Sequence, residues 1–298
     1  MSRAAGHVRT RALRVGLVML AGLAAVASAT AASARTDQQG WTQVRFGSPV
    51  AAVNGGIAAT SMNWAGYAVA ATGAAFPAGT TFSNVYGTWI QPAVTCTSGQ
   101  PSYSAFWVGL GGFDTSAQAL EQIGTAADCA GQTPSYYAWY ELVPAASVKV
   151  KLEVAPGDAM SGAVTVSGHV VSLRIRDLTR HTVVNRKLRM ASPDLSSAEL
   201  IAEAPSACNA SNRCHLLPLA NFGTVNFTSG AATATRRSAT FDDPSWSATQ
   251  IDLQQENGAG PGQLSPGAQA ASAVPTALGG SGSFSITWQS ASSVTPTP

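Results

Sequence analysis

Two short segments of the chain carry side chains that together can hydrolyse a polar bond. Leu120–Gly124 contains Gln122, and Ala198–Glu203 ends on Glu203 about 80 residues later. A carboxylate within hydrogen-bond reach of a water can take its proton, and a neutral amide can donate to the oxygen on which negative charge develops. An ordinary Glu has a pKa of about 4.3 and is ionised in moderately acid solution, where His cannot act as a base. Such a pair suits hydrolysis in acid.

Other common catalytic motifs are missing from the sequence. It contains no G-x-S-x-G, no H-E-x-x-H and no glycine-rich turn between a strand pattern and a helix pattern. The histidines after the first 34 residues, His169, His181 and His215, form no cluster with the cysteines, which argues against a zinc site. We therefore expect no metal and no organic cofactor.

The first 34 residues are typical of a secretory signal peptide. Four arginines precede an apolar run at 15–29, and small-x-small cleavage sequences follow at 27–29 and 32–34. A membrane anchor is the alternative, but a span needs about 20 strongly apolar residues, and this run is shorter and rich in Ala and Gly. We expect a secreted, extracellular protein that has no membrane contact after cleavage.

The charge of the chain argues against nucleic acid as a partner. Residues 1–34 hold four Arg and no acidic residue, so their removal lowers Lys+Arg from 17 to 13 while Asp+Glu stays at 15. The remaining chain carries about −2 and shows no basic patch or polyanion-binding signature. Charged residues are only 11% of the chain, against about 25% in a typical domain. Few ion pairs are therefore lost in acid.

Four cysteines, Cys96, Cys129, Cys208 and Cys214, remain after the signal peptide. An even number in an exported chain predicts two disulfides, and three pairings are possible. We favour a small loop closed by Cys208–Cys214, which leaves Cys96–Cys129 as the second bond.

Apolar and polar residues alternate in short segments, which is typical of antiparallel strands. The segment 148–154 alternates most clearly, and only 117–123 has a pattern compatible with a short helix. Further strand patterns lie at 163–166, 171–176, 182–184, 188–190, 224–228, 250–253 and 283–288. The sequence therefore predicts an all-β antiparallel sandwich or barrel.

Composition sets the expected domain boundaries. Residues 35–58 are polar and then rich in Gly and Ala, which predicts a short propeptide or a disordered arm. Residues 59–290 form the expected single β-sandwich domain, with a Gly/Pro/Ala/Ser-rich surface loop at 258–282. Residues 291–298 are expected to be a frayed tail.

An ordered series of motifs resembles the glutamic peptidases, also called eqolisins or peptidase family G1. That family's N-W-x-G, W-V-G, Q-x-G, A-W-Y-E-x-x-P and A-E-x-I-x-E follow one another here at 63–66, 107–109, 122–124, 138–144 and 198–203. Each motif alone is weak, but the ordered set covers roughly residues 61–230 and is specific. The small Cys208–Cys214 loop also looks like the family, and the chain resembles a bacterial-type member.

This resemblance implies a monomeric acid endopeptidase that acts on protein or peptide substrates. Its fold would be a concanavalin- or lectin-like sandwich of two large packed sheets. Gln122 aligns with the family's catalytic glutamine and would donate to the oxyanion. Glu203 aligns with the catalytic glutamate and would be general base and then general acid. Trp107, Trp139 and Glu141 look like members of the substrate cleft.

Strand alternation places the remaining carboxylates near this pair. Glu199 shares a face with Glu203 and is expected to be a supporting or rim residue, whereas Glu121 points away from Gln122 and is expected to be structural. Fungal members often carry an acidic residue where this chain has Gly111, so the support of that carboxylate is lost.

Two other functions are compatible with a lectin-like sandwich. In a glycoside hydrolase acting on β-glycans, Glu141 and Glu203 would be the carboxylate pair, although Glu141 lacks a strand motif that matches that of Glu203. A non-catalytic carbohydrate-binding sandwich would use the aromatic residues alone.

Overall fold

The chain divides into two units, Met1–Arg35 and Thr36–Pro298. The computed structural model describes residues 43–45, 51–52, 58–71, 76–77, 79–97, 99–114, 117–209, 214–235, 237–257, 264 and 268–290, all in the second unit. The expected signal peptide, most of the expected arm and the expected tail lie outside these residues. No helix in this described part is long and apolar enough to cross a membrane.

Two large antiparallel sheets build the second unit. The first, here called the front sheet, has the strand order β3 (Ala58–Ser61), β18 (Ser247–Gln254), β4 (Trp64–Ala70), β13 (Ser197–Glu203), β6 (Ser102–Leu110), β7 (Leu120–Ala130), β8 (Thr133–Val143) and β9 (Val148–Val150). Only the β3–β18 pair in this sheet is parallel. The front sheet carries every residue of the expected catalytic site.

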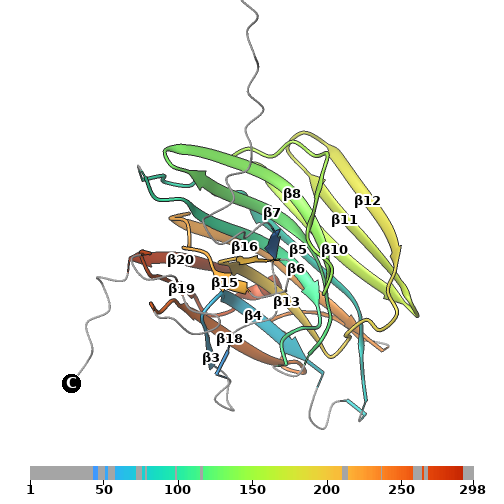
Figure 1. The fold of residues 1–298 in the computed structure, drawn as a ribbon. Coiled ribbons are helices and arrows are strands. Elements are labelled where there is room, and N and C mark those ends of the chain that lie inside the picture. Colours follow the sequence, from blue (N-terminus) through green and yellow to red (C-terminus); the bar gives the residue numbers. More distant parts are fainter. Residues whose placement is uncertain are drawn as a thin grey trace, which may run out of the picture. The chain divides into compact units, whose positions relative to one another are not determined.

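The second sheet, here called the back sheet, has the order β12 (Thr182–Arg189), β11 (Val170–Asp177), β10 (Ala159–Ser167), β5 (Phe82–Ile90), β16 (Thr224–Ala234), β20 (Phe284–Ser290) and β19 (Ala271–Pro275). β17 (Arg237–Thr240) also pairs with β16, and β19 pairs with β18 of the front sheet. Figure 1 shows β10, β11 and β12 side by side, with β12 outermost.

Four shorter strands and one turn of 3-10 helix complete the described part of the structure. β1 (Gln43–Arg45), β14 (Ser206–Cys208) and β15 (Cys214–Leu216) form a separate sheet, and β2 (Ala51–Ala52) pairs with β3. The 3-10 turn spans Gly280–Gly282.

The main core lies between the two sheets. Alternate residues of each strand face it, such as Phe106, Val108 and Leu110 on β6 and Leu173 and Ile175 on β11. Residues in between face outward, as the two-residue period of a strand requires. This arrangement confirms the expected antiparallel β-sandwich.

The structure corrects three details of the predicted elements. The segment 117–123 is not helical, because Leu120–Ala130 is a strand hydrogen-bonded on both sides, to β6 and β8. The strand expected at 148–154 ends at Val150, beyond which it no longer pairs with β8. The expected loop at 258–282 contains β19, which fills the space between β18 and β20. β19 consists mostly of small residues, so its sequence shows no clear alternation of apolar and polar side chains.

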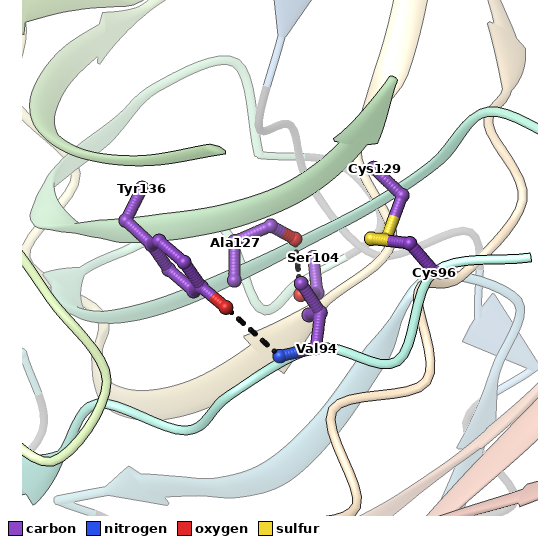
Figure 2. The surroundings of a disulfide bond; sticks show 6 residues. All are labelled: Val94, Cys96, Ser104, Ala127, Cys129 and Tyr136. Atoms are coloured by element: carbon purple, nitrogen blue, oxygen red, sulfur yellow. Dashed lines mark hydrogen bonds between the residues drawn. A yellow bond between two sulfur atoms is a disulfide. The ribbon is translucent and has the colours of Figure 1, made fainter. Parts of the chain in front are cut away.

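Both expected disulfides are formed. Cys96–Cys129 and Cys208–Cys214 have Cα–Cα distances of 5.4 and 4.0 Å. Figure 2 shows how the first bond ties the segment after β5 to the end of β7. Near it, the Val94 amide donates to the Tyr136 hydroxyl at 3.1 Å. The Cys96–Cys129 disulfide therefore anchors an irregular segment to the end of β7 in the front sheet.

The two disulfides should differ in their contribution to stability. A longer closed loop restricts the unfolded chain more, and the sequence separations are 33 and 6 residues. We expect replacement of Cys96 and Cys129 by Ala to lower the free energy of unfolding by about 3–4 kcal/mol, and the matched replacement of Cys208 and Cys214 by about 2 kcal/mol. Urea unfolding of both double variants measures this, and a larger loss for the shorter loop would contradict it.

Candidate functional site

The outer face of the front sheet, which points away from the main core, holds the candidate site. A second buried apolar cluster lies on this face and includes Trp64, Trp107 and Trp139. β6 runs through its centre, with β13 on one side and β7 on the other. Because residues directly opposite one another on paired strands share a face, the strand register decides which side chains meet.

One row of residues crosses four neighbouring strands of this face. Glu199 on β13 lies opposite Gly109 on β6, Gly109 lies opposite Gln122 on β7, and Gln122 lies opposite Glu141 on β8. Gly109 has no side chain, but the space above it is filled, because a Cβ there would be 2.8 Å from the Trp107 ring and 3.1 Å from Leu120 Cδ1. The Trp107 indole therefore covers Gly109 within this row.

Gln122 is held in a defined orientation. Its Nε2 donates to Glu141 Oε2 at 3.3 Å, and both side chains are buried. A buried amide with one fixed hydrogen bond has little rotational freedom. Glu141 therefore acts on the site through the orientation of Gln122.

Glu203 lies elsewhere on the same face. It is opposite Ala105 on β6 and Trp64 on β4, four residues along β13 from Glu199. Gln122 and Glu203 thus share the outer face, two strands and four residues apart, which is about 16 Å between Cα atoms. The side chains of Gln and Glu are long enough to span most of such a separation when they lean toward each other, and the Gln122–Glu203 pairing stays a prediction.

Glu203 is held by two neighbours on this face. Its Oε2 accepts a hydrogen bond from Trp107 Nε1 at 2.8 Å, and its Oε1 accepts one from Asn63 Nδ2 at 3.4 Å. The Trp107 ring also contacts the Trp64 ring edge-on, with centroids 4.9 Å apart. The Trp107 indole therefore contacts Glu203 and also covers Gly109, the residue opposite Gln122.

Two glycines make room for the tryptophans. Trp107 lies opposite Gly124, which lies opposite Trp139. A Cβ at Gly124 would be 2.3 Å from the Phe106 carbonyl oxygen, and one at Gly109 would be 2.8 Å from the Trp107 ring. The glycines of the W-V-G and Q-x-G motifs are therefore required for packing, because neither position has room for a Cβ.

Burial strongly favours the neutral form of Glu199. Desolvation raises its pKa well above the ordinary value, and the nearby carboxylates of Asp194 and Glu121 raise it further. The Ser197 hydroxyl offsets this only in part, and neither carboxylate oxygen makes a hydrogen bond of normal geometry within the described structure. A carboxyl group in this setting is a candidate for proton transfer.

Asp194 supplies a carboxylate next to Gly111. A Cβ at Gly111 would be only 2.5 Å from Asp194 Cβ, so position 111 has no room for an acidic side chain. The Asp194 carboxylate instead accepts hydrogen bonds from the amides of Gly112 at 2.9 Å and Ser196 at 3.0 Å. The carboxylate next to Gly111 therefore comes from Asp194, in the segment before β13.

A cavity of about 380 Å³ opens at this same end of β6, β7 and β13. It is lined by Asp114, Ala117, Gln118, Ala119, Ser192, Pro193, Asp194 and Ser196. The Glu199–Gln122 row itself is closed, since Gln122, Glu141, Glu199 and Glu203 are each at most 1% exposed. In the described part of the chain, no three His, Cys, Asp or Glu side chains are placed to hold a metal ion.

Comparisons with known proteins agree with this fold. A family model described as the Peptidase A4 family matches residues 62–269. Scytalido-glutamic peptidase with a transition state analog inhibitor is 24% identical, over 76% of this chain and 98% of that chain, with a TM-score of 0.60. SCP-B, a member of the eqolisin family of peptidases in a complex with the tripeptide Ala-Ile-His, has the same identity and coverage and a TM-score of 0.55. No curated protein matches the sequence.

The buried Glu121 should make the protein more stable in acid. Burial raises its pKa from 4.5 to about 8, opposed by a hydrogen bond from the Asp194 amide. Folding favours the protonated form of Glu121. Its contribution to the free energy of unfolding is therefore complete below pH 4.5 and is lost as the pH rises through about 8. We expect the free energy of unfolding in urea to fall over this range, and to fall less in Glu121→Gln.

The control for this measurement is Glu256→Gln, which changes an exposed carboxylate. It should keep the wild-type pH dependence. An unchanged slope in Glu121→Gln would show that Glu121 does not hold its proton in the folded state.

Proposed function

The chain belongs to the Peptidase A4 family, and from this membership we propose that it is a secreted acid endopeptidase in which Gln122 and Glu203 act on the peptide bond. The observation that supports this assignment is that both side chains are buried on the outer face of the front sheet beside one indole, that of Trp107, which donates to Glu203 and covers Gly109 opposite Gln122. Secretion is proposed from the signal-peptide pattern of residues 1–34 and is supported by the two disulfides.

In the proposed reaction, a water and the substrate carbonyl lie between the two side chains. Ionised Glu203 takes a proton from the water, whose oxygen attacks the carbonyl carbon. The Gln122 amide donates to the oxyanion, and Glu203 then gives its proton to the leaving amine. An amide donor adds no second negative charge beside Glu203, so the mutual repulsion of a carboxylate pair is avoided at this point.

Glu199 is proposed as a supporting residue on the same face of β13. Its pKa is raised chiefly by burial, so it holds its proton in acid and adds no negative charge on the face that it shares with Glu203.

Trp107 and Glu141 are proposed as positioning residues for the pair. The Trp107 indole N–H donates to Glu203 Oε2 at 2.8 Å. Glu141 Oε2 accepts from Gln122 Nε2 at 3.3 Å and would hold the amide in place.

Substitutions should distinguish the three residues. We expect Glu203→Gln to abolish hydrolysis of a denatured protein between pH 2 and 7, because an amide cannot take the proton of the water. Gln122→Ala should lower kcat by about 10²–10³-fold, the usual effect of removing an oxyanion donor. Glu199→Gln should lose much less, because burial keeps the Glu199 carboxyl protonated and an amide replaces it closely. Circular dichroism would verify the fold of each variant, with Glu256→Gln as the control.

The reverse order of activities would move the catalytic role to Glu199. Full activity in folded Glu203→Gln, together with complete loss in folded Glu199→Gln, would contradict the proposed pair. Activity that survives in all three variants would indicate a peptidase with a different site.

Residues 35–58 are proposed to be a propeptide of the peptidase domain at 59–290. Its described strands pair with that domain: β1 lies antiparallel to β14, just beyond Glu203 on the chain, and β2 lies antiparallel to β3. Strand pairing of this kind holds a segment in place chiefly through backbone hydrogen bonds. The closed catalytic row is what an inhibited precursor would have.

Removal of the arm should therefore activate the enzyme. We expect a chain that begins at residue 59 to hydrolyse a denatured protein at least tenfold faster than one that begins at residue 35, with the largest ratio near neutral pH. Arg35 and Arg45 are proposed to bind acidic groups of the peptidase domain near neutral pH. Arg45→Gln in the longer chain should therefore reduce the ratio of the two activities. Equal activity of the two chains at every pH would rule out inhibition.

A further inference from the structure

The basic residues of this chain are concentrated in one hairpin. After position 34 the sequence has 13 Lys and Arg residues, and six of them lie between 170 and 189 with Asp177 as the only acidic residue. This interval is β11, its turn and β12. The net charge of about −2 for the chain after the signal peptide hides this local excess.

Strand alternation gathers four of these cations on one surface. Arg174 and Arg176 on β11 are exposed, and they alternate with the core residues Leu173 and Ile175. Lys187 and Arg189 on β12 are also exposed and lie opposite Ser172 and Val170, on the same outer face. We name the four cations Arg174, Arg176, Lys187 and Arg189 the basic face.

Acidic groups do not neutralise the basic face. Asp177 is fully buried on the inner side of β11 and is paired with Arg180. The salt bridges of the described residues involve Arg180 and Arg237 and none of the four cations. Their charges therefore add to a positive potential on the outer side of the back sheet.

Protection of a sheet edge explains only part of this arrangement. β12 pairs with β11 and with no other described strand, and cations on an edge strand discourage pairing with another chain. Arg174 and Arg176 lie on the next strand inward, which is hydrogen-bonded on both sides by β10 and β12. Their outward side chains do not guard an edge, so they indicate a surface that binds something.

We propose that the basic face binds a linear phosphodiester polymer of small polyols. Three of its four cations are Arg, whose planar fork matches phosphate oxygens bidentately. A phosphodiester keeps its negative charge in acid, whereas a carboxylate polymer loses much of it. β10, β11 and β12 contain no aromatic residue on which a nucleic-acid base could stack. A base-free phosphodiester chain fits these three properties.

This surface lies on the opposite side of the sandwich from the proposed catalytic row. The main core separates the outward residues of the back sheet from those of the front sheet. An enzyme held by the basic face would therefore keep its catalytic face free. The sequence expectation of no polyanion-binding signature rested on net charge and on the absence of a charge run, and the pairing of β11 with β12 brings together cations that neither measure detects.

Binding of poly(glycerol phosphate) to the full chain at pH 4, measured over a series of salt concentrations, tests the proposal. The double variants Arg174→Gln/Arg176→Gln and Lys187→Gln/Arg189→Gln should each weaken binding about tenfold and flatten the salt dependence by about 1.4 log units per log of salt, since each lost contact contributes about 0.7. The control Arg186→Gln/Arg237→Gln removes the same charge outside the basic face and should weaken binding less than twofold.

Hydrolysis of a short soluble peptide should be the same in wild type and all three double variants, since the basic face is remote from the catalytic row. Equal binding by wild type and both basic-face variants would overturn the proposal. Tighter binding to single-stranded DNA or to polygalacturonate than to poly(glycerol phosphate) would also overturn it. Neither result depends on whether the chain is a peptidase.

Discussion

The register of β13, β6, β7 and β8 is the constraint on which the site depends. It places Glu199, Gly109, Gln122 and Glu141 in one row, and it places Gly124 between the two indoles of Trp107 and Trp139. A shift by one residue would turn these side chains into the main core. The missing side chains at Gly109 and Gly124 are as important as the side chains present, because they leave room for Trp107 and for the close approach of the strand backbones.

Buried carboxyl groups connect this arrangement to acid conditions. Burial raises the pKa of Glu199 and Glu121, and also that of Asp128, which reaches about 7 although Tyr137 donates to it at 2.9 Å. In acid these groups are neutral and their burial costs little, whereas near neutral pH each one opposes folding. The described residues form few ion pairs, so protonation of exposed carboxylates in acid lowers the free energy of unfolding only slightly.

Sequence reasoning predicted the fold class and the disulfide pairing, because alternation and ordered motifs are local signals. The motifs also predicted Gln122 and Glu203 as a pair, and alternation gives Glu199 and Glu203 the same face of β13. Their places along that face depend on how β13 aligns with β6, which is a contact between distant segments and does not follow from the sequence pattern. The basic face was missed for a related reason, since Arg174 and Lys187 meet only when β11 and β12 pair.

The most direct test of this account is a crystal structure of the chain without residues 35–58, in complex with a peptide that carries a tetrahedral transition-state analogue. The account predicts that the tetrahedral group lies between Glu203 and Gln122, with one oxygen against the Glu203 carboxylate and the other accepting from the Gln122 amide. A tetrahedral group that contacts Glu199 instead, with Glu203 away from the inhibitor, would contradict it.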